Sequence, residues 1–256
     1  MIRLLSGVAL AAAALAAILF LPVIGLRMLA SLVAVLAAHE YLRIAAPGAA
    51  RRQQGPVLLV VALVCWYMLL PDLQTLLALV LVALALLVMQ VLFGGVTIAQ
   101  ASAGFVAPWY VGLPLGMLVS VQALNGPHAT LLLIATVVLS DTAQYYSGRT
   151  FGRRPLAPTI SPKKTIEGAV GGLIFGTLFM AIAGPRVLPG AAPVPMAILG
   201  LTIVVLGICG DLFESRLKRD ANLKDSSTLI PGHGGVLDRI DALLFAIPAY
   251  YLYLRS

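Results

Sequence analysis

Charged residues are scarce in this chain. Only 11% of its 256 residues are Asp, Glu, Lys or Arg, whereas 61% are hydrophobic and the mean hydropathy is +1.01. This composition excludes an ordinary soluble domain, because apolar runs of about 20 residues have the length that crosses a bilayer. We therefore interpret the chain as an integral membrane protein, a single membrane domain over residues 1–256 without a soluble domain.

Cysteine is also rare. Cys65 and Cys209 both fall in apolar runs and lack metal-ligand spacing, which excludes a disulfide framework and a thiolate metal site. The Walker A pattern is missing, which argues against a P-loop ATPase. No basic and aromatic groove accompanies the net charge of +7, so nucleic acid is excluded as a partner.

Apolar runs fill most of the sequence. A chain of this length holds about nine spans of roughly 20 residues each. We predict an all-α, polytopic membrane fold with about nine transmembrane helices and a polar cavity on the cytoplasmic side. The predicted helices cover residues 4–21, 26–44, 56–70, 73–93, 105–124, 129–146, 168–183, 194–210 and 240–254. The first run is not a signal peptide, because a second apolar run follows after Pro22 without a polar mature segment.

Basic residues are unevenly distributed around these predicted spans. If the N-terminus lies inside, only Arg27, Arg186 and Arg255 fall outside, and the other 14 of the 17 basic residues fall inside. Such a positive-inside bias predicts that the polar segments 140–167 and 211–241 face the cytoplasm. An anionic cytoplasmic substrate would be attracted there.

A polar stripe ends the sixth predicted span. Asp141, Gln144 and Tyr145 share one helix face through their i, i+3, i+4 spacing, so the stripe enters the bundle instead of facing lipid. Two interpretations remain open: Asp141 pairs with Arg149 or another basic residue, or the stripe lines an aqueous site. Glu40, near the end of the second predicted helix, likewise either caps that helix or lines the site.

The loop 150–167 follows the stripe. Hydroxyls and ammonium groups of Ser161, Lys163, Lys164 and Thr165 precede a predicted helix N-terminus, a combination suited to holding phosphate. The basic residues of a flexible loop can instead be topology determinants or contacts to anionic lipid.

The segment 211–241 concentrates the charge. It holds six of the ten acidic residues, namely Asp211, Glu214, Asp220, Asp225, Asp238 and Asp241. Asp211 is expected at the end of an apolar span, and Asp238 follows the glycine-rich run 231–235, whose tight turns allow the carboxylates to meet. Carboxylates facing several Lys and Arg side chains suit Mg²⁺ bound to a polyphosphate, so phosphoryl or nucleotidyl transfer is indicated. His233 could act in acid/base chemistry or orient a ligand.

These residues resemble the phosphatidate cytidylyltransferase (CDP-diacylglycerol synthase) family, whose signature runs S-x-x-K-R-x(4)-K-D-x(5)-P-G-H-G-G-x-x-D-R-x-D. The chain matches every fixed position, at Ser215, Lys218, Arg219, Lys224, Asp225, Pro231, Gly232, His233, Gly234, Gly235, Asp238, Arg239 and Asp241. The family's upstream pattern is matched at Asp141, Gly148, Arg149, Phe151, Gly152 and residues 161–168. Gln144 departs from the family, because many members have a small residue there.

The resemblance implies transfer of CMP from CTP to phosphatidic acid by a homodimeric, many-helix enzyme of the bacterial inner membrane, with a cavity open to the cytoplasm and to lipid. It implies that Asp211 and Asp238 bind Mg²⁺, as one ion or two. The implied catalytic residues are Asp211, Asp238, Lys218, Arg219, Asp225, His233 and Arg239. The implied substrate-binding residues are Asp141, Tyr145, Arg149, Ser161, Lys163, Lys164, Thr165, Ser215, Lys224, Gly234, Gly235 and Asp241. The catalytic half is then residues 129–256, after N-terminal helices in residues 1–128.

Two other classes remain open. A CTP-dependent kinase of a lipid alcohol would use a similar site but release CDP, and a lipid transporter would also place basic residues at a bilayer face. The transporter gives no reason for a Gly-His-Gly-Gly turn between carboxylates. A CDP-alcohol phosphotransferase is disfavoured, because its D-G-x-x-A-R signature is missing.

Overall fold

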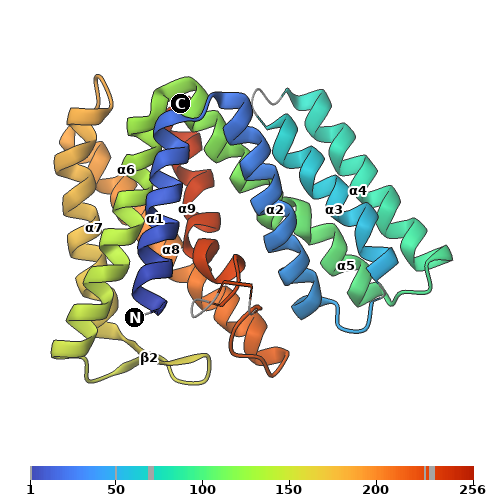
Figure 1. The fold of residues 1–256 in the computed structure, drawn as a ribbon. Coiled ribbons are helices and arrows are strands. Elements are labelled where there is room, and N and C mark those ends of the chain that lie inside the picture. Colours follow the sequence, from blue (N-terminus) through green and yellow to red (C-terminus); the bar gives the residue numbers. More distant parts are fainter. Residues whose placement is uncertain (1, 50, 69–71, 228, 231–233) are drawn as a thin grey trace. The chain divides into compact units, whose positions relative to one another are not determined.

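The computed structural model describes residues 2–256 except 50, 69–71, 228 and 231–233. These residues are almost entirely helical, with one short β-hairpin (Figure 1). In chain order the elements are α1 (Ile2–Phe20), α2 (Val23–Ala45), α3 (Arg51–Tyr67), α4 (Leu73–Phe93), α5 (Ile98–Ala107), the π-helical turn η1 (Pro108–Gly112), α6 (Leu113–Phe151), β1 (Pro155–Ala157), β2 (Ser161–Thr165), α7 (Ile166–Val187), α8 (Pro193–Asp220) and α9 (Leu237–Arg255).

Several of these helices have the length and composition of membrane spans. Within the described residues, five qualify, at Val23–Ala45, Leu73–Phe93, Ile98–Phe151, Ile166–Val187 and Pro193–Asp220. Shorter apolar helices cover Gly7–Phe20 and Gln53–Tyr67. The prediction of an all-α membrane protein is confirmed, and every predicted apolar segment overlaps a helix. The number of nine spans stays a prediction.

The chain divides into two compact units. Unit 1 comprises Met1–Ala123 and Asp220–Ile240, and unit 2 comprises Leu124–Arg219 and Asp241–Ser256. The signature 215–241 is therefore shared between them, with its glycine-rich part in unit 1 and its two ends in unit 2.

In unit 1, α3 packs between α2 and α4 (Figure 1). Val60, Val64 and Met68 meet Leu79 and Ala83 of α4 in one buried cluster. Burial of these aliphatic side chains against one another gives the helices a packed contact, which inside a lipid bilayer depends on van der Waals complementarity.

Local signals explain where α4 and α5 begin. The Asp72 carboxylate accepts hydrogen bonds from the backbone N–H of Thr75 at 2.7 Å and from its hydroxyl at 2.7 Å. These bonds cap α4 and hold the pKa of Asp72 below its usual range. Thr97 and Gln100 form a reciprocal capping box at the start of α5. The predicted helix 105–124 contains the π-helical turn that begins at Pro108.

In unit 2, a glycine face on α7 meets α6. A Cβ added at Gly168 would lie 2.8 Å from the Gln144 carbonyl oxygen, and one at Gly172 would lie 2.4 Å from Gln144 Cγ. These glycines let the two helices approach closely, as small residues do at helix crossings in membranes. The same α6 is bent at Gly126, where φ is 80°, between the fifth and sixth predicted helices.

Two predicted features of the polar segments need correction. The segment 150–167 is not simply a loop, because β1 and β2 pair antiparallel within it. Asp211 does not sit at a helix end either, because α8 continues to Asp220. The residues of 211–220 favour this continuation, because Glu, Leu, Lys and Arg are common among them and are good helix formers.

Candidate active site

Unit 2 contains a pocket of about 420 Å³ whose lining includes several charged side chains. It collects residues from the polar stripe of α6, from the hairpin, from the start of α7 and from α8. Its lining comprises Asp141, Gln144, Tyr145, Gly148, Arg149, Leu156, Lys163, Lys164, Thr165, Gly168, Ala169 and Asp211. Residues predicted from separate stretches of sequence therefore line one pocket.

The α6 stripe forms one wall of this pocket. Gln144 Nε2 donates a hydrogen bond to Asp141 Oδ1 at 2.9 Å, and Arg149 Nη1 donates to the Tyr145 hydroxyl at 3.1 Å. Asp141 lines the pocket, its carboxylate accepts a hydrogen bond from Gln144, and the charge of Lys164 lies close enough to act on it, so features of both interpretations of Asp141 are present. Ser140 Oγ, 3.3 Å from Gln144 Nε2, helps to orient the amide.

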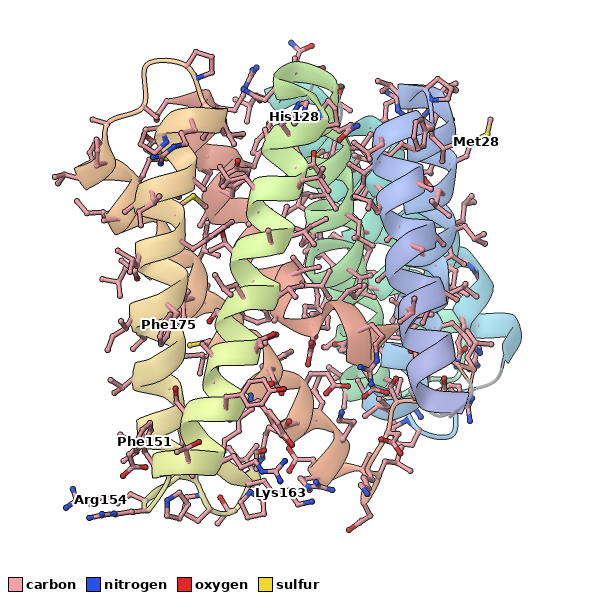
Figure 2. The ribbon with its side chains drawn as sticks, turned by 60° about the vertical axis from the view of Figure 1, so that its left-hand side comes forward. Met28, His128, Phe151, Arg154, Lys163 and Phe175 are labelled. Carbon is pink, nitrogen blue, oxygen red and sulfur yellow. The ribbon has the colours of Figure 1, made fainter. Side chains whose placement is uncertain are left out.

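The hairpin holds the two lysines beside the start of α7. Thr165 Oγ1 accepts a hydrogen bond from Gly168 N at 3.1 Å and so caps α7. Glu167 Oε2 accepts from the backbone N–H groups of Arg153 at 3.0 Å and Arg154 at 3.3 Å, which ties the hairpin entrance to α7. Lys163 is exposed at the same end of the unit as Arg154 (Figure 2). Ser161 is half-buried in β2.

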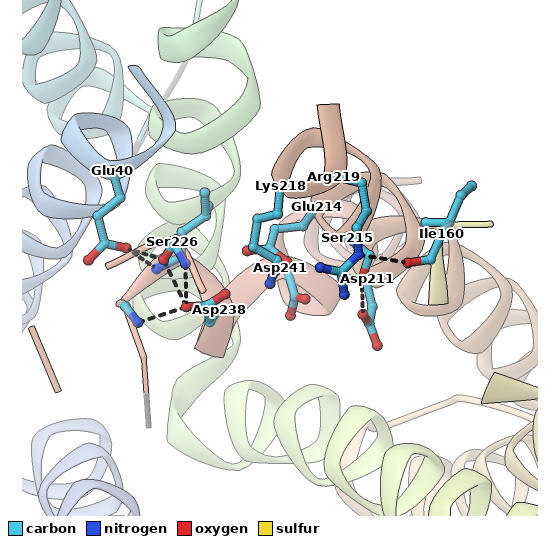
Figure 3. A network of polar contacts seen from close by, with 12 residues as sticks. Glu40, Ile160, Asp211, Glu214, Ser215, Lys218, Arg219, Ser226, Asp238 and Asp241 are labelled. Atoms are coloured by element: carbon cyan, nitrogen blue, oxygen red, sulfur yellow. Dashed lines mark hydrogen bonds and ion pairs between the residues drawn. The ribbon is translucent and has the colours of Figure 1, made fainter. Parts of the chain in front are cut away.

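Lys164 extends from β2 to α8. Its Nζ forms an ion pair with Asp211 Oδ2, and both side chains are partly buried. Ser215 Oγ lies 3.4 Å from Asp211 Oδ1, one helical turn further along α8 (Figure 3). The Lys164 ammonium and the Asp211 carboxylate thus compensate each other at the pocket wall.

The C-terminal turns of α8 carry the first signature residues. Lys218 Nζ pairs with Glu214, whose side chain is 1% exposed. Arg219 Nε donates to the backbone oxygen of Ile160 at 3.4 Å, which links the end of α8 to the hairpin (Figure 3). Asp241, the last signature residue, is half-buried in α9 close enough to Asp211 and Asp141 for their negative charges to repel it.

The glycine-rich part of the signature lies in unit 1. Asp238 Oδ2 accepts hydrogen bonds from Gly235 N at 2.7 Å and Ser226 N at 3.0 Å. It also lies 2.9 Å from Ser226 Oγ, whose single proton it shares with Glu40 Oε2 (Figure 3). Gly234 has a φ of 82°, a conformation that favours glycine. These bonds fix the direction of the Asp238 carboxylate.

Other predicted residues of this part are exposed. Lys224 and Asp225 lie in the turn before Ser226, and Arg239 lies in the first turn of α9. The backbone N–H of Arg239 donates to the Val236 oxygen at 3.0 Å. The prediction for His233 lies outside the described residues.

Glu40 is a residue whose partners sequence reasoning did not identify. Its carboxylate is 2% exposed and accepts hydrogen bonds from the hydroxyls of Ser226 at 2.9 Å and Ser227 at 2.6 Å, and from the backbone N–H groups of Val236 at 3.1 Å and Leu237 at 2.8 Å. It caps the start of α9 and not the end of its own helix. A carboxylate at a helix N-terminus is stabilised by about 0.3–1 kcal/mol, or more when partly buried.

We tested whether the described carboxylates suit a metal ion. No group of three or more His, Cys, Asp or Glu side chains in the described part of the chain is arranged to hold one. Mg²⁺ needs no such cage, because it binds through one or two carboxylates with water and substrate phosphate completing the shell. Asp141 and Asp211, which both line the pocket, fit that requirement. The predicted ligands Asp211 and Asp238 belong to different units, so their pairing stays a prediction.

Comparison with known proteins places these residues in a family. The model of the cytidylyltransferase family matches residues 1–256, the whole chain. The chain belongs to the cytidylyltransferase family. This confirms the resemblance derived from the signature.

Three bacterial relatives of this cytidylyltransferase family member match about half of the chain. The phosphatidate cytidylyltransferase of Aquifex aeolicus is 38% identical over 144 residues, which is 56% of this chain and 53% of the relative. That of Pseudomonas aeruginosa is 42% identical over 149 residues, 54% of this chain and 55% of the relative. The uncharacterized protein YnbB of Escherichia coli is 41% identical over 149 residues, 58% of this chain and 48% of the relative. The chain thus spans about half the length of the curated relatives it matches.

Proposed function

We propose that the chain transfers CMP from CTP to phosphatidic acid, forming CDP-diacylglycerol and pyrophosphate. The observation that carries this proposal is the complete signature from Ser215 to Asp241, in a chain matched over its whole length by the cytidylyltransferase family. Relatives 38% and 42% identical that are named phosphatidate cytidylyltransferase support the choice of substrate.

The unit 2 pocket supports the nucleotide half of the reaction. Lys163, Lys164 and Arg149 bring positive charge to a cavity large enough for the phosphates of a nucleotide. The N-terminus of α7, with Gly168 in the lining, adds backbone N–H groups suited to phosphate oxygens. Lys218 and Arg219 follow Asp211 on the same helix and are the signature cations for the remaining phosphate charge.

The reaction requires one bond to form and one to break. An oxygen of the lipid phosphate, already an anion, attacks the α-phosphorus of CTP in line. The bond from that phosphorus to the oxygen bridging to the β-phosphate breaks, and pyrophosphate leaves with the electron pair. No general base is needed, so the residues contribute by positioning and by neutralising charge.

Mg²⁺, bound by Asp211 with Asp238 or Asp141 and in one copy or two, would neutralise phosphate charge as a Lewis acid. Lys164, which pairs with Asp211, would contact a phosphate oxygen. Lys163 and Arg149 would hold the departing pyrophosphate against the pocket wall.

The finer membrane arrangement is also part of the proposal. Nine spans with the basic segments on the inside would place the polar cavity on the cytoplasmic face of a bacterial inner membrane, where CTP is available. Bacterial relatives and the five long apolar helices support this location. A homodimer is proposed from the family resemblance.

The decisive experiment is an assay of purified protein in mixed micelles with α-labelled CTP, phosphatidic acid and Mg²⁺. We expect label in the lipid phase that depends on phosphatidic acid and disappears with EDTA, together with pyrophosphate in the aqueous phase. CTP consumption only with a lipid alcohol, and release of CDP, would instead identify a lipid kinase. Lipid movement without CTP consumption would identify a transporter.

A further inference from the structure

The buried carboxylate of Glu40 in α2 accepts hydrogen bonds from residues that lie 186 to 197 positions later in the chain. Its four described partners are two hydroxyls and two backbone N–H groups, and none of them is a cation. A carboxylate that is 2% exposed is stable without a cation only when its oxygens are hydrogen-bonded, and here each oxygen accepts two bonds. We call this hydrogen-bonded group the clasp. It consists of Glu40, Ser226, Ser227, Val236 and Leu237.

The clasp is connected to Asp238 through a single hydroxyl. Ser226 Oγ lies 2.9 Å from Glu40 Oε2 and 2.9 Å from Asp238 Oδ2 (Figure 3). The Ser226 backbone N–H donates to the same Asp238 oxygen at 3.0 Å. Displacement of Ser226 from Glu40 would therefore also change the surroundings of Asp238.

Close packing leaves the clasp little freedom to rearrange. A Cβ added at Gly235 would lie 2.0 Å from Ser226 Oγ and 2.3 Å from Glu40 Oε2, so only glycine fits between them. The Gly235 N–H donates to Asp238 at 2.7 Å. The backbone at Gly235 is thus packed against Ser226 and Glu40 and hydrogen-bonded to Asp238.

We propose that Glu40 is a positioning residue of the enzyme: it holds Ser226, Ser227, Val236 and Leu237 in place and, through Ser226, sets the orientation of the Asp238 carboxylate. The role of Asp238 in this inference rests on the proposed function, whereas the clasp itself rests on the described contacts. Partners that orient a metal-binding carboxylate typically change metal affinity or activity by about 10–100-fold when they are altered.

The first test needs neither substrate nor metal. Hydrogen exchange of the metal-free protein is compared between wild type and Glu40→Gln, which replaces one acceptor oxygen by an NH₂ group. We expect faster exchange of the Gly235, Val236 and Leu237 amides in the variant. Asp72→Asn, which removes an exposed carboxylate that caps α4, is the matched control and should leave these amides unchanged. Unchanged exchange rates of these amides in Glu40→Gln would show that Glu40 does not hold this segment of backbone in place.

The second test separates positioning from a loss of folded protein. Glu40→Gln should lower kcat about 10–100-fold and raise the half-saturating Mg²⁺ concentration, with a smaller change in KM for CTP. Ser226→Ala should do the same, and the double variant should lose much less than the product of the two single losses. Independent, multiplicative losses, or an unchanged Mg²⁺ dependence, would refute the link from Glu40 to Asp238.

A matched pair of variants distinguishes a positioning effect from a loss of folded protein. Ser227→Ala removes a hydroxyl that contacts Glu40, whereas Ser226→Ala removes one that contacts both carboxylates. Ser226→Ala should therefore shift the Mg²⁺ dependence more than Ser227→Ala, even if Glu40→Gln fails to accumulate in the membrane. Equal effects of the two would contradict the proposal. If wild-type protein produces no lipid label, the proposed function fails while the exchange result still decides the clasp.

Discussion

Asp211 pairs with Lys164 at the wall of the unit 2 pocket, so a substitution of Asp211 tests the proposed metal site. Asp211→Asn keeps the size of the side chain but removes the charge that we propose holds Mg²⁺. We expect kcat/KM to fall by at least about 100-fold, a loss typical of removing one main electrostatic contact in a site. The assay with labelled CTP measures it, with Asp72→Asn as the control carboxylate. Near-normal turnover would remove Asp211 from the metal site.

Two glycines of unit 1 predict changes of different size in stability. An alanine at Gly235 meets the Ser226 and Glu40 side chains, so overpacking should lower stability by about 1–3 kcal/mol. An alanine at Gly55 in α3 meets no such side chain, but it would stand before Pro56, whose ring disfavours helical backbone at a preceding residue that carries a Cβ, so the helix-propensity gain over glycine should be offset and stability should change less than in Gly235→Ala. Thermal unfolding in detergent measures both, and a stabilised Gly235→Ala would contradict the packing described here.

Residues that line the pocket were predictable where the sequence motif is local. Asp141, Lys164 and Asp211 were predicted as site residues, and they line one pocket, while their roles stay predictions. Glu40 was predicted either to cap the end of its own helix or to line the site. Its partners lie 186 to 197 positions away, a separation over which helical periodicity carries no information.

At the scale of elements, the hairpin depends on one glutamate. Glu167→Ala removes the acceptor for the Arg153 and Arg154 amides, so the strand that carries Lys163 should become more mobile. We expect a higher KM for CTP with a smaller change in kcat, and faster proteolysis within residues 153–165. Thr202→Ala, on α8, is a control, since that hydroxyl bonds only to the Ile198 oxygen of its own helix. A KM that does not change would show that the hairpin needs no such tether.

Helices were more predictable than the elements between them. Apolar runs of nearly span length, such as 73–93, coincide with the helix, because inside lipid every backbone group must bond within the segment. The hairpin escaped prediction, since prolines and glycines in 150–167 indicate turns without fixing which residues pair. The true end of α8 was missed for a different reason: hydropathy ends at Gly210, but helix propensity does not.

At the scale of the whole molecule, the positive-inside bias predicts the orientation in the membrane. The 22 residues of α7 would span about 33 Å, enough to cross a hydrocarbon core of about 30 Å, so Arg154 and Ala192 should face opposite sides. In a protein with Cys65 and Cys209 replaced by alanine, Arg154→Cys should react with an impermeant thiol reagent only from the cytoplasmic side. Ala192→Cys should react only from the other side. The reverse pattern would invert the proposed topology.

The Lys164–Asp211 pair would couple the affinity for nucleotide to the affinity for metal. Asp211 would hold the proposed metal ion with the same carboxylate that pairs with Lys164, and Lys164 would neutralise phosphate with the same ammonium group. Nucleotide and metal would therefore bind with positive thermodynamic linkage, in which each raises the affinity for the other by the same factor. Lys164→Met would abolish part of that reciprocity while leaving the metal carboxylate in place. Lys164 and Asp211 would thus each exchange one counter-ion for another, the ammonium group for a phosphate and the carboxylate for the metal ion.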